Sequence, residues 1–201
     1  MSLLNTLTLA MGTAWVSGIN LYASVATLGL LGRFAHLQLP GELMALTSWW
    51  VIGVALALYL IEFIADKIPL IDSAWDVIHT FIRVPAGAVL AMAALGDFDT
   101  GIQAIAFLLG GGLALSSHGT KAATRAMINT TPEPVTNVVA SVTEDFVAVS
   151  SVLLAVFYPV LLVVVVVVGL LISLFVLPRT IRYFRAVVGK MRGTADSERH
   201  P

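Results

Sequence analysis

Four side chains that can bind or relay an ion recur at one-turn spacing in the segment DKIPLIDSAWDVIHTFIRVP, residues 66–85. On an α-helix they fall within an arc of about 60°, because each residue turns the chain by about 100°. One narrow face of one helix therefore carries two carboxyl groups, an imidazole and a guanidinium group. Since an imidazole changes charge near neutral pH, this set can hold a cation or a small polar solute, or pass a proton. The four residues are Asp72, Asp76, His79 and Arg83.

A weaker copy of this stripe follows 65 residues later. That offset aligns PLIDSAWDVIHTFIRV (69–84) with PVTNVVASVTEDFVAV (134–149), with four identical positions. Asn137, Ser141 and Glu144 then take the helical positions of the first three stripe residues. The offset predicts an internal two-helix repeat, and membrane transport proteins often place their sites between repeats. A second self-match, SGINLYAS (17–24) with HGTKAATR (118–125), predicts an inverted three-plus-three arrangement instead. Both readings stay open.

Other polar residues are predicted to gather on the same side of the membrane as the stripes. Two carboxyl groups four residues apart end the second helix, and cationic residues follow the fourth. In the first helix, Gly18 precedes an asparagine at a point where the backbone could open to a ligand. The further candidate site residues are Asn20, Glu62, Asp66, His118, Lys121, Arg125 and Asp145.

The composition indicates that lipid is the solvent of this chain. Hydrophobic residues make up 58% of the 201 residues and charged residues 11%, whereas soluble domains carry about 45–50% and about 25%. The mean hydropathy is +0.94. Because the sequence has no cysteine, disulfides, thiolate metal sites and cysteine nucleophiles are excluded. HExxH and GxSxG motifs are also missing from the sequence, so zinc-protease and serine-hydrolase chemistry have no support and no cofactor is expected.

Charge-free runs predict the membrane-spanning segments, since a helix needs about 20 apolar residues to cross the bilayer. The last run, residues 146–178, is too long for one crossing, and Pro159 offers a natural break. The prediction is an all-α polytopic membrane bundle of about six transmembrane helices in residues 1–178, followed by a basic cytoplasmic tail in 179–201. The expected spans are 7–31, 43–63, 72–95, 100–120, 136–157 and 160–178.

Positive charge predicts the orientation. Six of the eleven Lys and Arg residues follow Leu177, and such residues concentrate on the cytoplasmic side of membrane proteins. The C-terminus is therefore expected in the cytoplasm, and six spans return the N-terminus to the same side. Apolar residues at helical spacing in the tail favour contact with anionic lipid headgroups. The expected partners are the lipid bilayer, those headgroups and, as an option, a second copy in a homodimer; nucleic acid is not expected.

Four segments carry a family resemblance: SGINLYAS (17–24), DKIPLIDSAWD (66–76), HGTKAATRAMINTTPEP (118–134) and TEDF (143–146). Together they resemble a family of bacterial integral-membrane proteins known as domain of unknown function family 4126 (DUF4126). The resemblance implies a multi-pass protein of the bacterial inner membrane. It implies no catalytic or binding residue, because the family has no settled activity.

The stripes favour a small transporter or channel-like protein for an ion or small polar solute, with a polar cavity between the repeats. A charge at the membrane centre is costly, so Arg83 is expected to face the bundle interior and to pair with Asp76 or Glu144. One alternative is a non-transporting membrane scaffold or partner-binding protein whose polar network only fixes helix register. A less favoured alternative is a metal-dependent membrane enzyme with a divalent cation held by carboxylate and imidazole groups. Its ligands would be Asp72, Asp76, His79 and Glu144.

Overall fold

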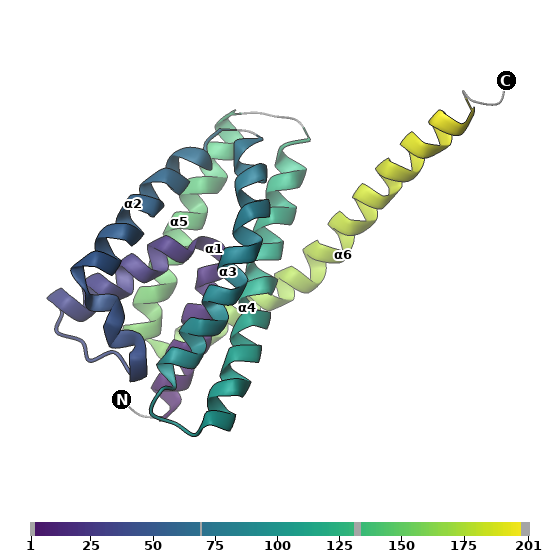
Figure 1. Cartoon of the computed structure of the whole chain (residues 1–201). Helices are drawn as coiled ribbons and strands as arrows, with labels where there is room; N and C mark the ends of the chain where they lie inside the picture. The colour runs from purple at the N-terminus through teal and green to yellow at the C-terminus, as the bar shows by residue number, and fades with distance from the viewer. Residues whose placement is uncertain (1–2, 69, 131–133, 198–201) are drawn as a thin grey trace.

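The chain folds into an all-α bundle, as predicted (Figure 1). The computed structural model describes residues 3–68, 70–130 and 134–197, and all regular structure in these ranges is helical. The elements in chain order are α1 (Leu3–Phe34), the 3-10 helix η1 (Gly41–Thr47), α2 (Trp49–Ala65), α3 (Ile71–Ala94), α4 (Thr100–Ile128), α5 (Pro134–Phe157) and α6 (Pro159–Ser197). Five of the described helices are long and apolar enough to cross a membrane, and η1 with α2 forms a sixth candidate, bent by 72°.

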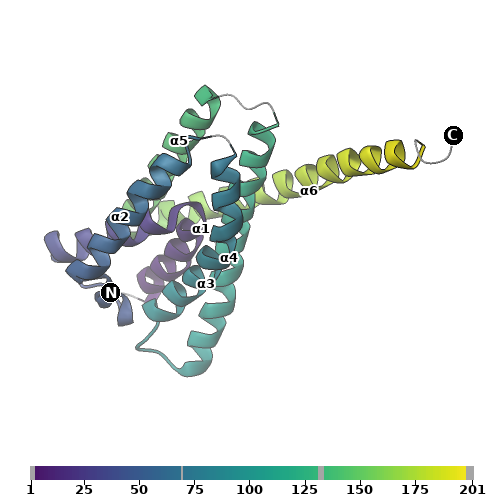
Figure 2. The ribbon, with the colours of Figure 1, turned by 45° about the horizontal axis from the view of Figure 1, so that its top comes forward.

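Three element boundaries differ by six or more residues from the predicted ones. The fourth span was expected to end at residue 120, but α4 continues to Ile128. The second span was expected to begin at residue 43, but η1 occupies that segment and α2 begins at Trp49. The last span was expected to end at residue 178, but α6 continues to Ser197 and projects from the bundle (Figures 1 and 2). In the predicted tail, the side chains of Val188, Lys190 and residues 191–201 lie outside the described part of the structure.

The first helix is broken near its middle, whereas a single continuous span over 7–31 was expected. Its backbone leaves helical geometry at Asn20 (φ −148°, ψ 100°), and its second half turns sideways (Figures 1 and 2). Leu3, at the start of α1, lines one pocket together with residues 38–41, which follow α1, and with Asp97. The chain therefore returns to the end of the bundle at which α1 began. The turning point of α1, at the break near Asn20, reaches the middle of the bundle, and we call it the tip of α1.

Helices α2 to α5 run along the bundle in alternating directions and define its two ends, and α6 crosses it obliquely (Figures 1 and 2). We call the end that holds Leu3 and the α3–α4 turn the N-terminal end, and the opposite end the C-terminal end. Helix α6 begins beside the first half of α1, where Leu162 contacts Gly12. It passes the last turn of α4, where Thr180 Oγ1 donates a hydrogen bond to Met127 Sδ. The described part of α6 thus runs from the N-terminal end to the C-terminal end and beyond.

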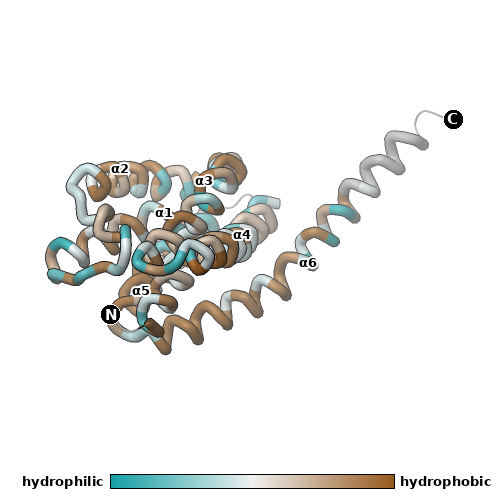
Figure 3. The backbone as a smooth tube through the Cα atoms, turned by 60° about the horizontal axis from the view of Figure 1, so that its bottom comes forward, coloured by the Kyte–Doolittle hydropathy of each residue, from teal (hydrophilic) through white to brown (hydrophobic). Residues whose placement is uncertain are grey.

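Small residues allow α1, α3 and α4 to pack closely. A Cβ atom on Gly87 would lie 2.5 Å from the Cβ of Ala114, and one on Gly110 would lie 2.5 Å from the Cβ of Ala91. Close backbone approach of this kind is how helices associate in lipid, where burial of apolar surface gives little driving force. Toward the N-terminal end the core is apolar, with Leu9, Ala10, Ala14, Leu90, Ala91 and Leu95. Helix α6 is hydrophobic over most of its described length (Figure 3).

Candidate functional site

The stripe on α3 faces the bundle interior. Asp72, Asp76, His79 and Arg83 are all buried, and none is more than 2% exposed. Residues from α2, α4 and α5 meet them in the half of the bundle toward the C-terminal end. We call the ionisable groups that meet there, apart from the histidines and Lys67 at the rim, the charged cluster. Its members are Glu62, Asp66, Asp72, Asp76, Arg83, Lys121, Arg125, Glu144 and Asp145.

Arg83 occupies the deep end of the charged cluster. Its guanidinium Nη2 donates to Glu62 Oε1, while Nη1 donates to the backbone oxygens of Gly18 at 3.2 Å and Ile19 at 2.9 Å. Asp76 Oδ1 lies 3.8 Å from Nη1. The prediction named Asp76 or Glu144 as the partner, but the nearest carboxylate comes from α2. Antiparallel packing of α2 against α3 places Glu62 at the depth of Arg83, and helical periodicity does not encode that placement.

Two cations on α4 join the stripes of α3 and α5. Lys121 Nζ lies 2.9 Å from Asp66 Oδ2 and 3.4 Å from both Glu62 Oε1 and Glu144 Oε2. Arg125 donates to both oxygens of Glu144 at 3.1 and 2.7 Å, the two-pronged geometry that guanidinium groups favour. The two predicted stripes therefore face the same interior. They are joined by the cations of α4 that lie between them.

Arg125 also holds the rim of the charged cluster together. Its Nη1 donates to the backbone oxygens of Asp66 and Asn137, both at 3.1 Å, and lies 3.7 Å from Asp72 Oδ2. Asn129, a residue that the sequence did not single out as a site residue, donates to both oxygens of Asp72 at 2.8 and 3.0 Å.

At the end of α2, Lys67 donates to Ser141 Oγ on α5 at 3.3 Å. Lys67 lies outside the membrane-spanning segments, and its partial burial lowers the pKa of its ammonium group. This contact places Lys67 at the rim of the charged cluster, on the side of α5.

The break in α1 supplies backbone groups to the same interior. Arg83 binds the carbonyls at the end of the first half, where a helix carries unpaired acceptors and partial negative charge. The Asn20 side chain caps the second half, because its Oδ1 accepts from the Ala23 N–H at 2.9 Å. Its Nδ2 donates to Asp145 Oδ1 at 2.9 Å. Side chains of α1, α3 and α5 therefore satisfy both ends of the break.

Two histidines flank the charged cluster on its apolar side. His118 Nδ1 lies 3.4 Å from Arg83 Nη1, and Nε2 carries a ring proton because its neighbour Asp76 O is a carbonyl oxygen that can only accept. Nε2 then donates to Asp76 O at 3.1 Å or to Thr80 Oγ1 at 2.8 Å. His79 Nδ1 donates to Trp75 O at 2.8 Å, and its Nε2 accepts from the Tyr22 hydroxyl at 3.1 Å. These partners fit neutral imidazoles.

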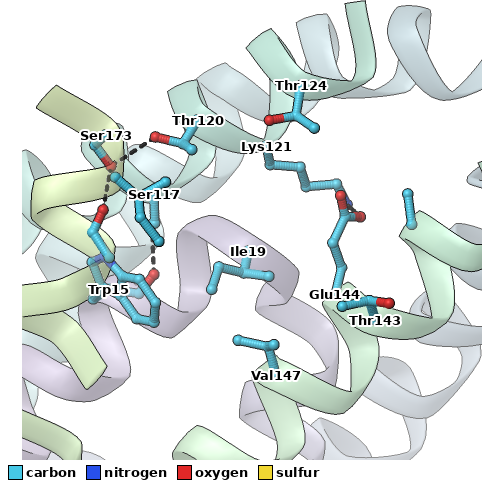
Figure 4. A pocket seen from close by; sticks show the side chains of 13 residues that line it. Trp15, Ile19, Ser117, Thr120, Lys121, Thr124, Thr143, Glu144, Val147 and Ser173 are labelled. Carbon is cyan, nitrogen blue, oxygen red and sulfur yellow. Dashed lines mark hydrogen bonds and ion pairs between the residues drawn. The ribbon is translucent and has the colours of Figure 1, made fainter. Parts of the chain in front are cut away.

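A pocket of about 340 Å³ opens beside the charged cluster, between α1, α4, α5 and α6. Lys121 from α4 and Glu144 from α5 point toward each other on its wall (Figure 4). The Glu144 side chain is 17% exposed, whereas those of its partners Lys121 and Arg125 are at most 2% exposed. Glu144 is therefore the point at which the charged cluster meets this pocket.

Several oxygen atoms of the charged cluster have no hydrogen-bond partner among the described residues. They are Glu62 Oε2, Asp66 Oδ1, both carboxylate oxygens of Asp76 and Asp145 Oδ2. A buried polar atom without a partner is costly, and such atoms commonly mark a place where a ligand, a proton or water is exchanged. The proposed divalent-cation site gains no support, because no three His, Asp or Glu groups in the described ranges converge to hold a metal ion.

All fourteen predicted site residues lie in this half of the bundle or at the α1 break that closes it. Sequence reasoning missed Tyr22, Thr80, Asn129 and the backbone carbonyls at the α1 break. Tyr22 and Thr80 lie in apolar, helical contexts that carry no distinguishing pattern. Asn129 stood in a conspicuous polar run, NTTPEP, directly after the cationic residues of α4, and that signal could have identified it.

Comparison with known proteins gives one match. No curated protein and no solved structure resembles the chain closely enough to be counted as a relative. A family model described as "Domain of unknown function (DUF4126)" matches residues 7–179, which include α2 to α5, most of α1, the first half of α6 and the whole charged cluster. The chain is an integral membrane protein of the DUF4126 family.

Proposed function

We propose that this protein is a small transporter or channel-like protein, and that the charged cluster is the path of an ion or small polar solute. The observation that supports this most strongly is a set of buried ionisable groups, with unpartnered carboxylate oxygens, that meets a pocket at Glu144. Ionisable groups inside a membrane bundle are expensive and usually mark ion or substrate paths. A network that served only helix register would be expected to satisfy its own oxygens.

In the arrangement described here, a solute can reach the charged cluster only from the half of the bundle toward the C-terminal end. Below Arg83, toward the N-terminal end, the first half of α1 fills the bundle among apolar residues such as Leu9 and Ala91. A solute that crosses must therefore displace α1. The break at Asn20 provides the hinge, since broken helices in transporters place free backbone groups at the site and let half-helices move. Helix α1 acts as the plug in this proposal.

Flux into proteoliposomes tests the proposal. Vesicles with the wild-type protein should pass protons, alkali cations or small polar solutes faster than empty vesicles, as reported by trapped dyes and isotope uptake. The carboxylate oxygens of Asp76 make no hydrogen bond to the described residues, so Asp76→Asn removes the charge and keeps the side-chain shape. This variant should slow the flux by about tenfold, which corresponds to a barrier higher by about 1.4 kcal/mol. The matched control is Asp97→Asn, in an exposed turn. Equal flux in wild-type and empty vesicles across the panel would reject transport.

A second candidate function, a partner-binding membrane scaffold, is favoured by the shape of α6. This helix projects from the bundle and exposes Arg179, Arg182 and Arg185 (Figure 2). Replacing these three arginines by glutamine separates the two functions. If the protein is a transporter, the triple variant should show unchanged flux. If it is a scaffold, the triple variant should lose binding to anionic vesicles or to a stoichiometric partner.

The termini are proposed to lie on opposite sides of a bacterial inner membrane. A re-entrant α1 leaves five crossings, so a cytoplasmic C-terminus, favoured by its arginines, leaves the N-terminus outside. The six-span expectation had placed both termini in the cytoplasm. Epitope tags on the two termini should therefore be digested by a protease added to opposite faces of the membrane. Digestion of both tags from one face would show an even number of crossings and contradict the re-entrant helix.

A further inference from the structure

The charged cluster contains more carboxyl groups than cations. Six carboxyl groups meet only three buried cations, Arg83, Lys121 and Arg125. Lys67 at the rim adds a fourth positive charge. The carboxyl groups are Glu62, Asp66, Asp72, Asp76, Glu144 and Asp145. If all six were ionised, the interior would hold an excess of about two negative charges, which a low-dielectric interior does not tolerate without neutralisation.

The histidines do not supply the missing positive charge. His118 Nδ1 lies 3.4 Å from the Arg83 guanidinium, whose positive charge disfavours a second positive charge on the ring. Burial likewise disfavours the charged form of His79, whose Nε2 is bonded to the uncharged Tyr22 hydroxyl. Neutralisation must therefore come from protons on carboxyl groups or from a bound cation. Most carboxyl groups here already lie within 4 Å of a Lys or Arg nitrogen, which repels a metal cation.

Asp145 differs from the other five carboxyl groups. It makes no ion pair with any Lys or Arg in the described part of the chain, although it is only 8% exposed. Its Oδ1 accepts from the uncharged amide of Asn20, and its Oδ2 has no hydrogen-bond partner among the described residues. The groups that face it are Asn20 from α1, Tyr59, Glu62 and Asp66 from α2 with Lys67 after it, and Lys121 from α4.

We propose that Asp145 is the proton-binding residue of this protein and that it carries a proton on Oδ2 in the arrangement described here. The proton comes from a hydronium ion in the water that reaches the charged cluster from the pocket at Glu144. The hydronium ion loses one O–H bond and becomes water, while Asp145 gains one O–H bond and loses its negative charge. A neutral Asp145 fits its uncharged neighbours, the Asn20 amide and the Tyr59 phenol. An ionised Asp145 would be the one carboxylate of the cluster without a cation.

This assignment deepens the proposed function by naming the coupling ion as a proton. Asn20 links Asp145 to the α1 break, since one side chain both caps the second half of α1 and binds the carboxyl group. Loss of the proton places a charge beside the N-terminus of that half-helix, where partial positive charge attracts it. Ionisation of Asp145 therefore strengthens its hold on the second half of α1, and protonation weakens that hold and favours movement of the plug.

Infrared spectroscopy of the full-length protein in lipid nanodiscs tests the assignment. A protonated carboxyl group gives its own C=O stretching band, which shifts in D₂O, and ¹³C-labelled aspartate distinguishes Asp from Glu. At neutral pH the wild type should show an Asp band that Asp145→Asn removes and the control Asp97→Asn retains. If Asp145→Asn does not fold, Asp145→Glu replaces it in the test. In that variant the protonated carboxyl band should no longer be shifted by ¹³C-labelled aspartate, because the proton is then on a glutamate.

Two results would overturn the assignment. One is a wild-type spectrum without any protonated carboxyl band at neutral pH. The other is an Asp band that persists in Asp145→Asn, which would place the proton on another aspartate; its loss in Asp76→Asn would identify that residue. The measurement needs no transport, so a band without flux would reject the proposed function alone. Flux without a band would reject the proton site alone.

Discussion

Arg83→Met is expected to lower the free energy of unfolding by about 3–5 kcal/mol, because it leaves buried charges and carbonyls without their partner. Arg83 is fully buried and bonds Glu62 together with the backbone oxygens of Gly18 and Ile19. Methionine keeps most of the side-chain length, so the loss reports the missing charge and hydrogen bonds. Thermal unfolding in detergent, followed by circular dichroism, measures the effect.

Two variants make this prediction specific. Arg33→Ala removes an exposed arginine whose Nη1 donates to Thr47 O, and it should change stability by no more than about 0.5 kcal/mol. Adding Glu62→Leu to Arg83→Met should recover part of the loss, since the orphaned carboxylate is then gone as well. A protein as stable with Arg83→Met as without it would show that the guanidinium is not bound in the interior.

Gly18→Ala is expected to destabilise the bundle by about 1–3 kcal/mol by separating α1 from α4. A Cβ at this position would collide with Ser117 Oγ and Ala114 O and would lie 2.9 Å from His118 N. Two of these three atoms belong to the backbone and cannot rotate away. The shift would also move the Gly18 carbonyl from Arg83, so flux is expected to fall together with stability.

Gly112→Ala is the matched control for this second substitution. It lies within α4, and nothing is within 4 Å of a Cβ added there. Alanine is the better helix former by about 1 kcal/mol, so this variant should be as stable as the wild type or slightly more stable. Equal melting temperatures for Gly18→Ala and Gly112→Ala would contradict the close contact between α1 and α4.

The sequence predicted the stripe on α3 because helical periodicity is a property of one segment. Asp72 and Arg83 had to share a face once that segment was helical, and the cost of a membrane-buried charge turned the face inward. Which residue would meet Arg83 was not predictable in this way. Glu62 comes from another helix, and its depth is set by the order and tilt of helices, which no single-segment pattern contains.

The bent path of α1 was equally beyond the pattern. Residues 1–32 carry no charge, so nothing in them distinguishes a helix that crosses from one that turns back. The break itself had a local signal, since Gly18 and Asn20 interrupt an apolar run and asparagine readily caps a new helix. The internal repeat stays a prediction, because the described helices do not test it.

Accessibility of single cysteines tests the central claim, that the charged cluster is connected to water at the C-terminal end. The chain has no cysteine, so each introduced thiol reports one position. Ser141→Cys at the rim of the charged cluster and Thr143→Cys on the pocket wall should react with a membrane-impermeant thiol reagent added on the cytoplasmic side. Val152→Cys, buried farther along α5, should not react. If Ser141→Cys and Thr143→Cys are as unreactive as Val152→Cys from both sides, the interior is dry and the account is wrong.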